Sequence, residues 1–143
     1  MCFHFLFTAL LADGILREET YKDLDFTFKQ NPNTNDVAIK KNNAAVIQSC
    51  LNILRTNNGE RPFNYDFGAN LRSYLFENMN QITAANMSTS INVALKNYEP
   101  RIEVLNTNIQ ARADDNEVYI TVTGRVKSTN EIIDISTTIE RLR

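Results

Sequence analysis

Carboxylates are the side chains in this sequence that could do chemistry, and four candidates are Glu60, Asp66, Glu77 and Glu99. Two carboxyl groups about 5–5.5 Å apart, or about 6.5–9.5 Å apart, can hydrolyse a glycosidic bond when an apolar pocket raises one pKa. However, no Glu is followed nine residues later by Asp, the spacing that opens the catalytic pattern of phage-type lysozymes. The chain also has no Trp to stack on a sugar. These carboxylates are therefore better interpreted as ion-pair partners or as part of a solvated face.

Other catalytic chemistry lacks its residues. His4 is the only histidine, and the two cysteines, Cys2 and Cys50, are far apart in sequence. A Cys/His zinc site would have too few ligands, and a Ser–His or Cys–His pair would have to use His4. Four glycines form no phosphate-binding loop. We therefore expect no catalytic residue, no metal, no cofactor and no small-molecule substrate.

Composition favours one ordinary domain without a surface for nucleic acid. The chain has 143 residues, with 15 Lys and Arg against 17 Asp and Glu, so its net charge is −2. The two signs are mixed along the chain, whereas a nucleic-acid surface needs clustered positive charge. Cys50 falls on an apolar helix face, which predicts a small buried side chain and no disulfide.

Residues 1–12 form an apolar run that is too short to cross a bilayer about 30 Å thick as a helix. No Lys or Arg precedes Arg17, so the run also lacks the basic start of a signal peptide. We expect no membrane anchor. Two interpretations remain open: an extension foreign to the domain, or an apolar arm that docks on a neighbour.

Helical periodicity marks the middle of the chain. Apolar residues recur at helical spacing over 43–56, with Asn42 or Asn43 as the N-cap. A short helix is predicted over 70–77, with Leu71 and Leu75 buried and Phe76 as a further core candidate. The clearest pattern predicts a helix from Thr83, its cap, to about Tyr98, with Ile82 stapled onto Met87. Pro100 ends it.

Strand periodicity marks both flanks. Alternation over 24–28 and 37–40 predicts an N-terminal hairpin with a half-buried face. After Arg101, alternation predicts strands at 102–111, 117–127 and 132–140, separated by turns at 114–116 and 128–130. Helices precede strands, so the predicted class is α+β: one small domain with amphipathic helices packed on an antiparallel sheet that ends in a hairpin or meander.

Several short motifs follow one another in a fixed order across the middle of the chain. Each is unspecific alone, so the order and spacing carry the signal. The motifs are Gly59-Glu60-Arg61-Pro62-Phe63, Phe67-Gly68, Leu75-Phe76-Glu77-Asn78 and Asn97-Tyr98-Glu99-Pro100-Arg101.

This series resembles the small baseplate wedge subunit of contractile-tailed phages, a family that has carried the label tail lysozyme and has relatives in type VI secretion baseplates. The resemblance covers about residues 21–143 and leaves 1–20 as an extension. It implies a structural, non-enzymatic subunit of the virion's tail baseplate, assembled in the host cytoplasm. It would join the helical core bundle of the wedge to the first sheath ring, whose strand would pair with an open sheet edge. A tail lysozyme and the type VI subunit are the alternatives.

The resemblance also implies that Glu99-Pro100-Arg101 binds the core bundle. Proline aims the chain at this corner and brings an acid and a guanidinium together. From the residues alone, an internal salt bridge between helix and first strand is an equal alternative, and an exposed pair adds only about 0–1 kcal/mol to folding. Glu60 and Arg61 are further partner-binding candidates that could join the same network.

Residues 59–68 are predicted to form the bend after the first long helix. Gly59 suits a left-handed C′ position beyond the helix end. Phe63 and Phe67 are predicted to fill the core.

Overall fold

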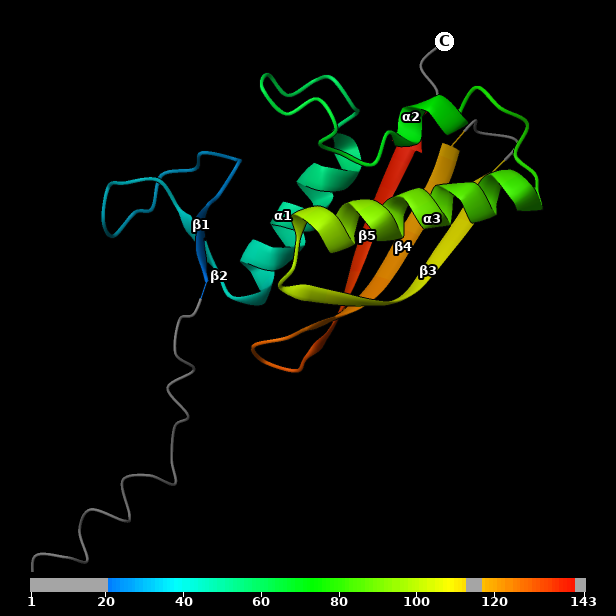
Figure 1. Ribbon diagram of the computed structural model, residues 1–143. Coiled ribbons are helices and arrows are strands. Elements are labelled where there is room, and N and C mark those ends of the chain that lie inside the picture. Colours follow the sequence, from blue (N-terminus) through cyan, green and yellow to red (C-terminus); the bar gives the residue numbers. More distant parts are fainter. Residues whose placement is uncertain (1–20, 113–116, 141–143) are drawn as a thin grey trace, which may run out of the picture.

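A three-stranded antiparallel sheet is the centre of the fold. The computed structural model describes residues 21–112 and 117–140. The strands are β3 at Ile102–Arg112, β4 at Glu117–Val126 and β5 at Ile132–Glu140, and they are ordered β3-β4-β5 (Figure 1). The expected turn at 114–116 lies outside the described residues. The turn before β5 is confirmed, because the Asn130 N–H donates to the Val126 carbonyl oxygen at 2.8 Å.

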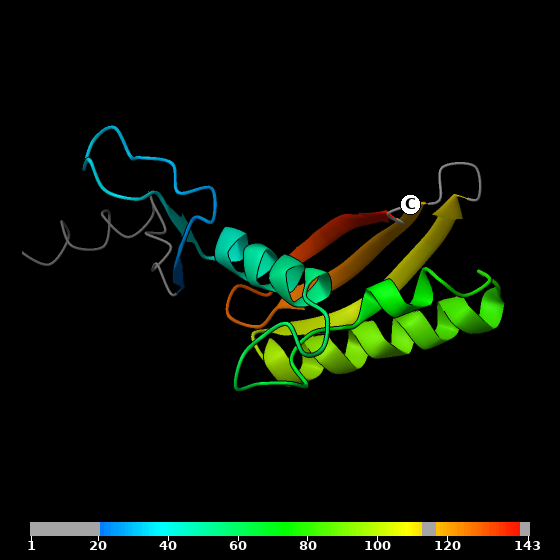
Figure 2. The same ribbon diagram turned by 90° about the horizontal axis from the view of Figure 1, so that it is seen from above.

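Three helices precede the sheet in the chain and cover one of its faces (Figure 2). They are α1 at Asn43–Arg55, α2 at Leu71–Tyr74 and α3 at Gln81–Tyr98. The α+β class is therefore confirmed. The second helix is shorter than predicted, and Phe76 beyond it is 69% exposed.

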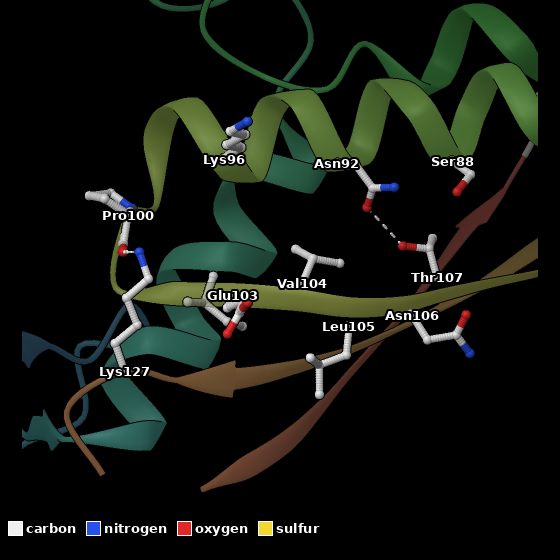
Figure 3. Close-up of a pocket in the computed structure, with 11 residues that line it drawn as sticks. Ser88, Asn92, Lys96, Pro100, Glu103, Val104, Leu105, Asn106, Thr107 and Lys127 are labelled. Atoms are coloured by element: carbon white, nitrogen blue, oxygen red, sulfur yellow. Dashed lines mark hydrogen bonds between the residues drawn. The ribbon is translucent and has the colours of Figure 1, made fainter. Parts of the chain in front are cut away.

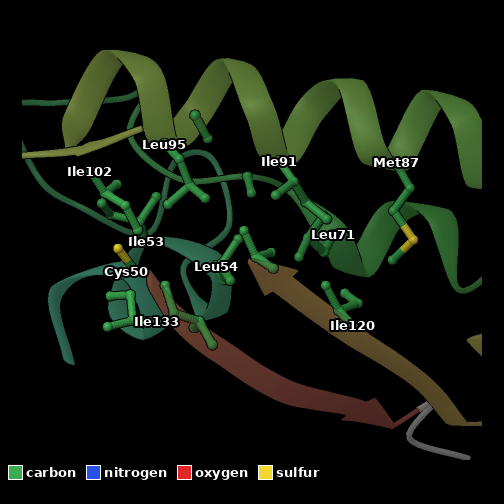
Figure 4. Packing of buried hydrophobic residues seen from close by; sticks show 14 of the residues in the cluster. Cys50, Ile53, Leu54, Leu71, Met87, Ile91, Leu95, Ile102, Ile120 and Ile133 are labelled. Carbon is green, nitrogen blue, oxygen red and sulfur yellow. The ribbon is translucent and has the colours of Figure 1, made fainter. Parts of the chain in front are cut away.

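The core lies between the helices and the sheet. Alternate residues of β4 are buried and the residues between them are partly exposed, as the period of two predicts. Figure 4 shows side chains from α1 and α3 meeting those of the sheet. The most buried members include Cys50, Ile53, Met87, Leu95 and Ile120.

Helix α3 begins earlier than predicted. Asn80 is its N-cap, because the Asn80 Oδ1 accepts the Thr83 N–H at 2.8 Å. Asn, like Thr, is a favourable N-cap, so sequence preference alone did not decide between them. The predicted Thr83 cap is wrong, and so is the staple through Ile82, whose side chain is 72% exposed.

Strand β3 contains a β-bulge. The register places Val104 opposite Gly124 and Asn106 opposite Thr123, so Leu105 is the inserted residue. An insertion of one residue exchanges the two faces of a strand. The side chains directed to the helices therefore change from even to odd numbers along β3, which simple alternation did not predict.

A second, two-stranded sheet forms a hairpin that projects from the rest of the fold (Figures 1 and 2). Its strands are β1 at Lys22–Leu24 and β2 at Ile39–Lys41. The predicted pairing is confirmed, but the first strand ends at Leu24 because Asp25 starts a turn: its carboxylate accepts the Thr27 N–H at 3.0 Å. The predicted half-buried face is wrong, since Leu24, Phe26 and Phe28 are 55%, 56% and 66% exposed.

The segment between α1 and α2 is a long loop. Phe67 packs against the core as predicted, whereas Phe63 is fully exposed, so its predicted core position is wrong. Gly59 has a φ of 83°, but α1 is capped by Thr56, which places Gly59 beyond the C′ position. Its N–H donates to the Tyr65 carbonyl oxygen at 2.8 Å and closes the loop instead.

Candidate functional site

Glu99, Pro100 and Arg101 form the corner between α3 and β3. Glu99 ends the helix, since its N–H donates to Leu95 O at 2.9 Å and proline follows. Its side chain turns inward and the residue is 1% exposed. Arg101 Nε and Nη2 donate to the two Glu99 carboxylate oxygens at 2.5 and 2.6 Å. The motif thus forms a bidentate pair across the corner.

Both members of this pair are charged at neutral pH. Burial raises the pKa of Glu99, but hydrogen bonds from Arg101 and Ser49 and the charge of Arg101 outweigh it, so the pKa lies below its ordinary value. The hydrogen bond to Glu99 in turn raises the pKa of Arg101. A buried pair of this kind depends on both partners being present.

The pair ties the corner to two other elements. The Arg101 guanidinium lies over the Tyr21 ring, 5.1 Å from its centre, just before β1. On the α1 side, burial and, to a smaller extent, the charge of Glu99 raise the pKa of the Cys50 thiol to about 12. Cys50 is therefore a protonated, apolar side chain, as predicted.

A groove of about 660 Å³, here called the α1 groove, lies beside this corner. Its floor is the face of α1 that includes Ser49, the residue that hydrogen-bonds Glu99. Its walls come from hairpin residues Asp23 and Phe26 and from the loop after α1. The groove therefore connects three segments that are distant in sequence.

Glu60 and Arg61 lie on the loop wall of the α1 groove. The Glu60 carboxylate accepts the Asn57 backbone N–H at 3.0 Å and the Asn57 Nδ2 at 2.7 Å, and these bonds lower its pKa. The Arg61 guanidinium lies 4.6 Å from the centre of the Phe67 ring. Among the described residues no hydrogen bond or ion pair joins them to Glu99 or Arg101. The two halves of the predicted site share a groove and form no common charge network.

Sequence reasoning missed two residues of this site. Tyr21 lies at the limit of the recognised motifs, so nothing marked its ring as the platform for Arg101. Ser49 precedes Cys50 on a helix whose apolar stripe dominated the pattern. A polar residue beside a buried position was the one available signal.

A second groove of about 760 Å³ separates α3 from β3 (Figure 3). Its polar side chains include Asn92 and Thr107, which hydrogen-bond across it at 3.0 Å. At one end the Lys127 Nζ donates to the Pro100 carbonyl oxygen at 2.7 Å. This groove follows the free edge of the sheet and ends at the Glu99-Pro100-Arg101 corner.

Within residues 21–112 and 117–140, no three His, Cys, Asp or Glu side chains gather as a metal site would need. In the same described segments, no helix combines the length and the apolar character of a membrane span.

Comparison with known proteins assigns the family. The family model described as baseplate wedge protein gp25 matches residues 40–131. Baseplate wedge protein gp25 of Enterobacteria phage T4 is 36% identical over 102 residues, which are 71% of this chain and 76% of that protein. The chain therefore belongs to the gp25 family of baseplate wedge proteins, which confirms the predicted resemblance.

Solved structures share the fold. A putative tail lysozyme from Geobacter sulfurreducens is 29% identical with a TM-score of 0.63, over 68% of this chain and 89% of that one. A chain of the anti-feeding prophage baseplate is 21% identical with a TM-score of 0.60, over 82% and 83%. A chain of the post-contraction pyocin R2 baseplate is 16% identical with a TM-score of 0.54, over 85% and 100%.

Proposed function

We propose that this chain is a non-enzymatic structural subunit of the tail baseplate of a contractile phage. In the virion it joins the helical core bundle of the wedge to the first sheath ring and helps to initiate sheath assembly. Its partners are other wedge proteins and the tail sheath protein, with no nucleic acid, membrane or small-molecule substrate. Family membership supports the baseplate assignment.

The observation that carries the core-bundle contact is the α1 groove beside the Glu99–Arg101 pair. The Arg101 side chain is 30% exposed while Glu99 is 2% exposed, so the arginine is the member that a partner can reach. The lining includes the exposed aromatic ring of Phe26. Aromatic and arginine side chains supply most of the binding energy at protein interfaces.

Sheath docking is supported by the sheet topology. In the order β3-β4-β5, β3 and β5 are the two edges of the described sheet. An edge strand can pair with an extended strand of another protein through backbone hydrogen bonds. We assign the sheath contact to one of these edges.

The hydrolase alternative is disfavoured by the candidate carboxylates themselves. A general acid needs a raised pKa, whereas hydrogen bonds lower the pKa of Glu60 and the Arg101 pair lowers that of Glu99. We expect purified protein not to clear a peptidoglycan suspension. Clearing that is lost in Glu60→Gln or Glu77→Gln, with folding intact, would restore the tail-lysozyme assignment.

The core-bundle contact is tested by co-expression with the wedge partners and calorimetry of the purified chains. Arg61→Ala and Phe26→Ala remove exposed groups that line the α1 groove, so we expect unchanged melting and at least about tenfold weaker binding, equal to about 1.4 kcal/mol. Lys96→Ala, on α3 away from the α1 groove, is the matched control. Normal binding by both groove variants would exclude this groove as the docking site.

The type VI secretion subunit is the other setting that the sequence resemblance implies. Genome neighbourhood distinguishes the two settings directly. Capsid genes beside the sheath and tube genes would support the phage assignment, whereas genes for a secretion membrane complex would replace it with the type VI subunit.

A further inference from the structure

The outer face of the β1–β2 hairpin is an exposed apolar surface. Leu24 and Ile39 are directly opposite each other in the antiparallel register, so their side chains share one face. They are 55% and 51% exposed, and Phe28 on the same hairpin is 66% exposed. A two-stranded hairpin is marginally stable by itself, and a cluster of exposed apolar side chains indicates a surface that something covers.

The contacts described between this hairpin and the body lie on its inner side. Gln48 Nε2 donates to the Leu24 carbonyl oxygen at 2.7 Å, and the Asn42 N–H donates to the Tyr21 carbonyl oxygen at 2.8 Å. The intermediate burial of Asp23 and Lys40 marks the side that faces α1. The apolar pair points the other way, and no described element covers it (Figure 1).

The chain itself supplies a segment of matching chemistry beside this surface. Residues 1–20 join the described fold at Tyr21, one residue before β1. Residues 17–20 span about 13 Å when extended, enough to turn back over a three-residue strand. A segment tethered this closely experiences a millimolar effective concentration of its site. Its apolar side chains are Phe3, Phe5, Leu6, Phe7, Leu10, Leu11, Ile15 and Leu16.

The charges of the hairpin and of the segment before it are also complementary. Lys22 and Lys41 are also opposite each other, on the same face as the apolar pair and at its Tyr21 end. The tether carries Arg17, Glu18 and Glu19, so its net charge is −1. A segment that turns back at the tether places acids near lysines and apolar side chains near the pair beyond them. A basic tether would oppose that arrangement.

We propose that residues 3–16 dock on the outer face of the chain's own β1–β2 hairpin, over Leu24 and Ile39. This assigns the apolar N-terminal run a place in the fold. It does not depend on the proposed function.

The full-length chain offers a direct reporter because it contains no Trp. In Phe7→Trp, the single tryptophan is expected to emit at a shorter wavelength than in urea and to resist acrylamide quenching. Adding Leu24→Ser and Ile39→Ser should return both readings to the values of a solvent-exposed tryptophan. These two side chains are already more than half exposed, so the far-UV spectrum and the melt should not change.

Val93→Ser is the control, since Val93 is 52% exposed on α3 and lies outside the hairpin. With this control substitution, the tryptophan should still emit at a shorter wavelength than in urea. Emission that is already solvent-like in Phe7→Trp, or that ignores the hairpin double variant, would overturn the proposal. A shift that disappears on dilution would also overturn it, because that result assigns the contact to a second copy.

Discussion

At the scale of single residues, the Glu99–Arg101 pair combines a structural role with an exposed cation. The acid is 1% exposed and both of its oxygens accept from the arginine, so the pair is an internal brace between α3 and β3. These two bonds use Nε and Nη2 of the guanidinium, and Nη1 takes no part in them. The same arginine can therefore hold Glu99 and also contact a partner protein.

We expect Arg101→Ala to lower the free energy of unfolding of the isolated chain by about 3–5 kcal/mol, because it leaves a buried carboxylate unpaired. The contribution of about 0–1 kcal/mol that holds for an exposed ion pair does not apply to this buried pair. Arg101→Lys should cost less than alanine but more than zero, since an ammonium keeps the charge and loses the bidentate geometry. Urea denaturation of each variant measures the difference.

Arg125→Ala is the control for this prediction. Arg125 Nη1 lies 4.0 Å from a Glu103 carboxylate oxygen, and both side chains are exposed. Its loss should cost at most about 1 kcal/mol. Equal costs for the two arginines would contradict the brace.

The same pair predicts a dependence of stability on acid. The pKa of Glu99 is lower in the folded chain than its ordinary value of 4.5. The stabilisation is therefore complete above pH 4.5 and is lost as the pH falls through the lower, folded value. Unfolding free energies measured from pH 7 downward should fall more steeply in the wild type than in Glu99→Gln. Parallel curves would show that this carboxylate does not contribute.

At the scale of elements, periodicity predicted the pieces whose burial follows one simple period. Helices α1 and α3 and strands β4 and β5 came within a few residues of their bounds, because each has one face against the core. Two errors in the element bounds fall where a local hydrogen bond sets the end of an element: Asn80 caps α3, and Asp25 turns the chain after β1. A third falls at Leu105, where an inserted residue shifts the register of β3.

The candidate site was predictable in part for the same reason. Glu99 and Arg101 are two residues apart, so their pairing follows from local geometry. Tyr21 and Ser49 reach the corner only through tertiary packing, and no local pattern encodes that approach. Glu60 and Arg61 were correctly placed in the loop after α1, but the residue spacing could not show that they lie on a groove wall.

Alanine substitution at two glycines in the loop after α1 should lower the free energy of unfolding by different amounts. Gly68 has a φ of 115°, and a Cβ there would lie 2.3 Å from the Thr56 carbonyl oxygen, which is backbone. Gly68→Ala should cost about 3 kcal/mol, the upper end for strained backbone. At Gly59, φ is 83° and the nearest atom is 3.2 Å away on the Tyr65 ring, which is exposed and can move.

Gly59→Ala should therefore cost only about 1 kcal/mol. Thermal denaturation of the two variants gives the comparison. If Gly59→Ala proves the more damaging, the loop does not close against the end of α1 as described.

We expect the apolar segment before Tyr21 to contribute little to the stability of the domain. Among the described residues the buried core begins at Ala45, so a chain that starts at Thr20 keeps every core residue that the structure describes. We expect it to melt cooperatively near the midpoint of the full chain, because the proposed contact of residues 3–16 is with a projecting hairpin and not with this core. Calorimetry of both chains is the measurement. A broad or much earlier transition would place the phenylalanines inside the domain.

At the scale of the whole molecule, the fold separates two kinds of surface. Helices occupy one face of the sheet, and the α1 groove opens beside the Glu99–Arg101 corner. The edges β3 and β5 leave backbone groups for another chain. A subunit that binds helices through a groove and a strand through an edge can hold two partners at once, as the proposed function requires.

The final prediction concerns which edge strand, β3 or β5, receives the sheath strand. Ser136 in β5 is opposite Thr121 in β4, and of the described strands only β4 has neighbours on both sides. Proline removes a backbone donor and distorts every ladder that it touches, so Thr121→Pro should unfold the chain while Ser136→Pro costs less. Both variants are compared by urea denaturation, and the folded one is tested for wedge binding and for sheath initiation in assembly reactions.

If β5 receives the sheath strand, Ser136→Pro should reduce sheath initiation and leave wedge binding unchanged, because the α1 groove is formed by other elements. The matching substitution on the other edge is Asn108→Pro in β3, opposite Thr121 on the far side. Loss of initiation in that variant alone would move the docking edge to β3, beside the groove under α3. Normal initiation in both folded variants would exclude strand addition as the mode of sheath attachment.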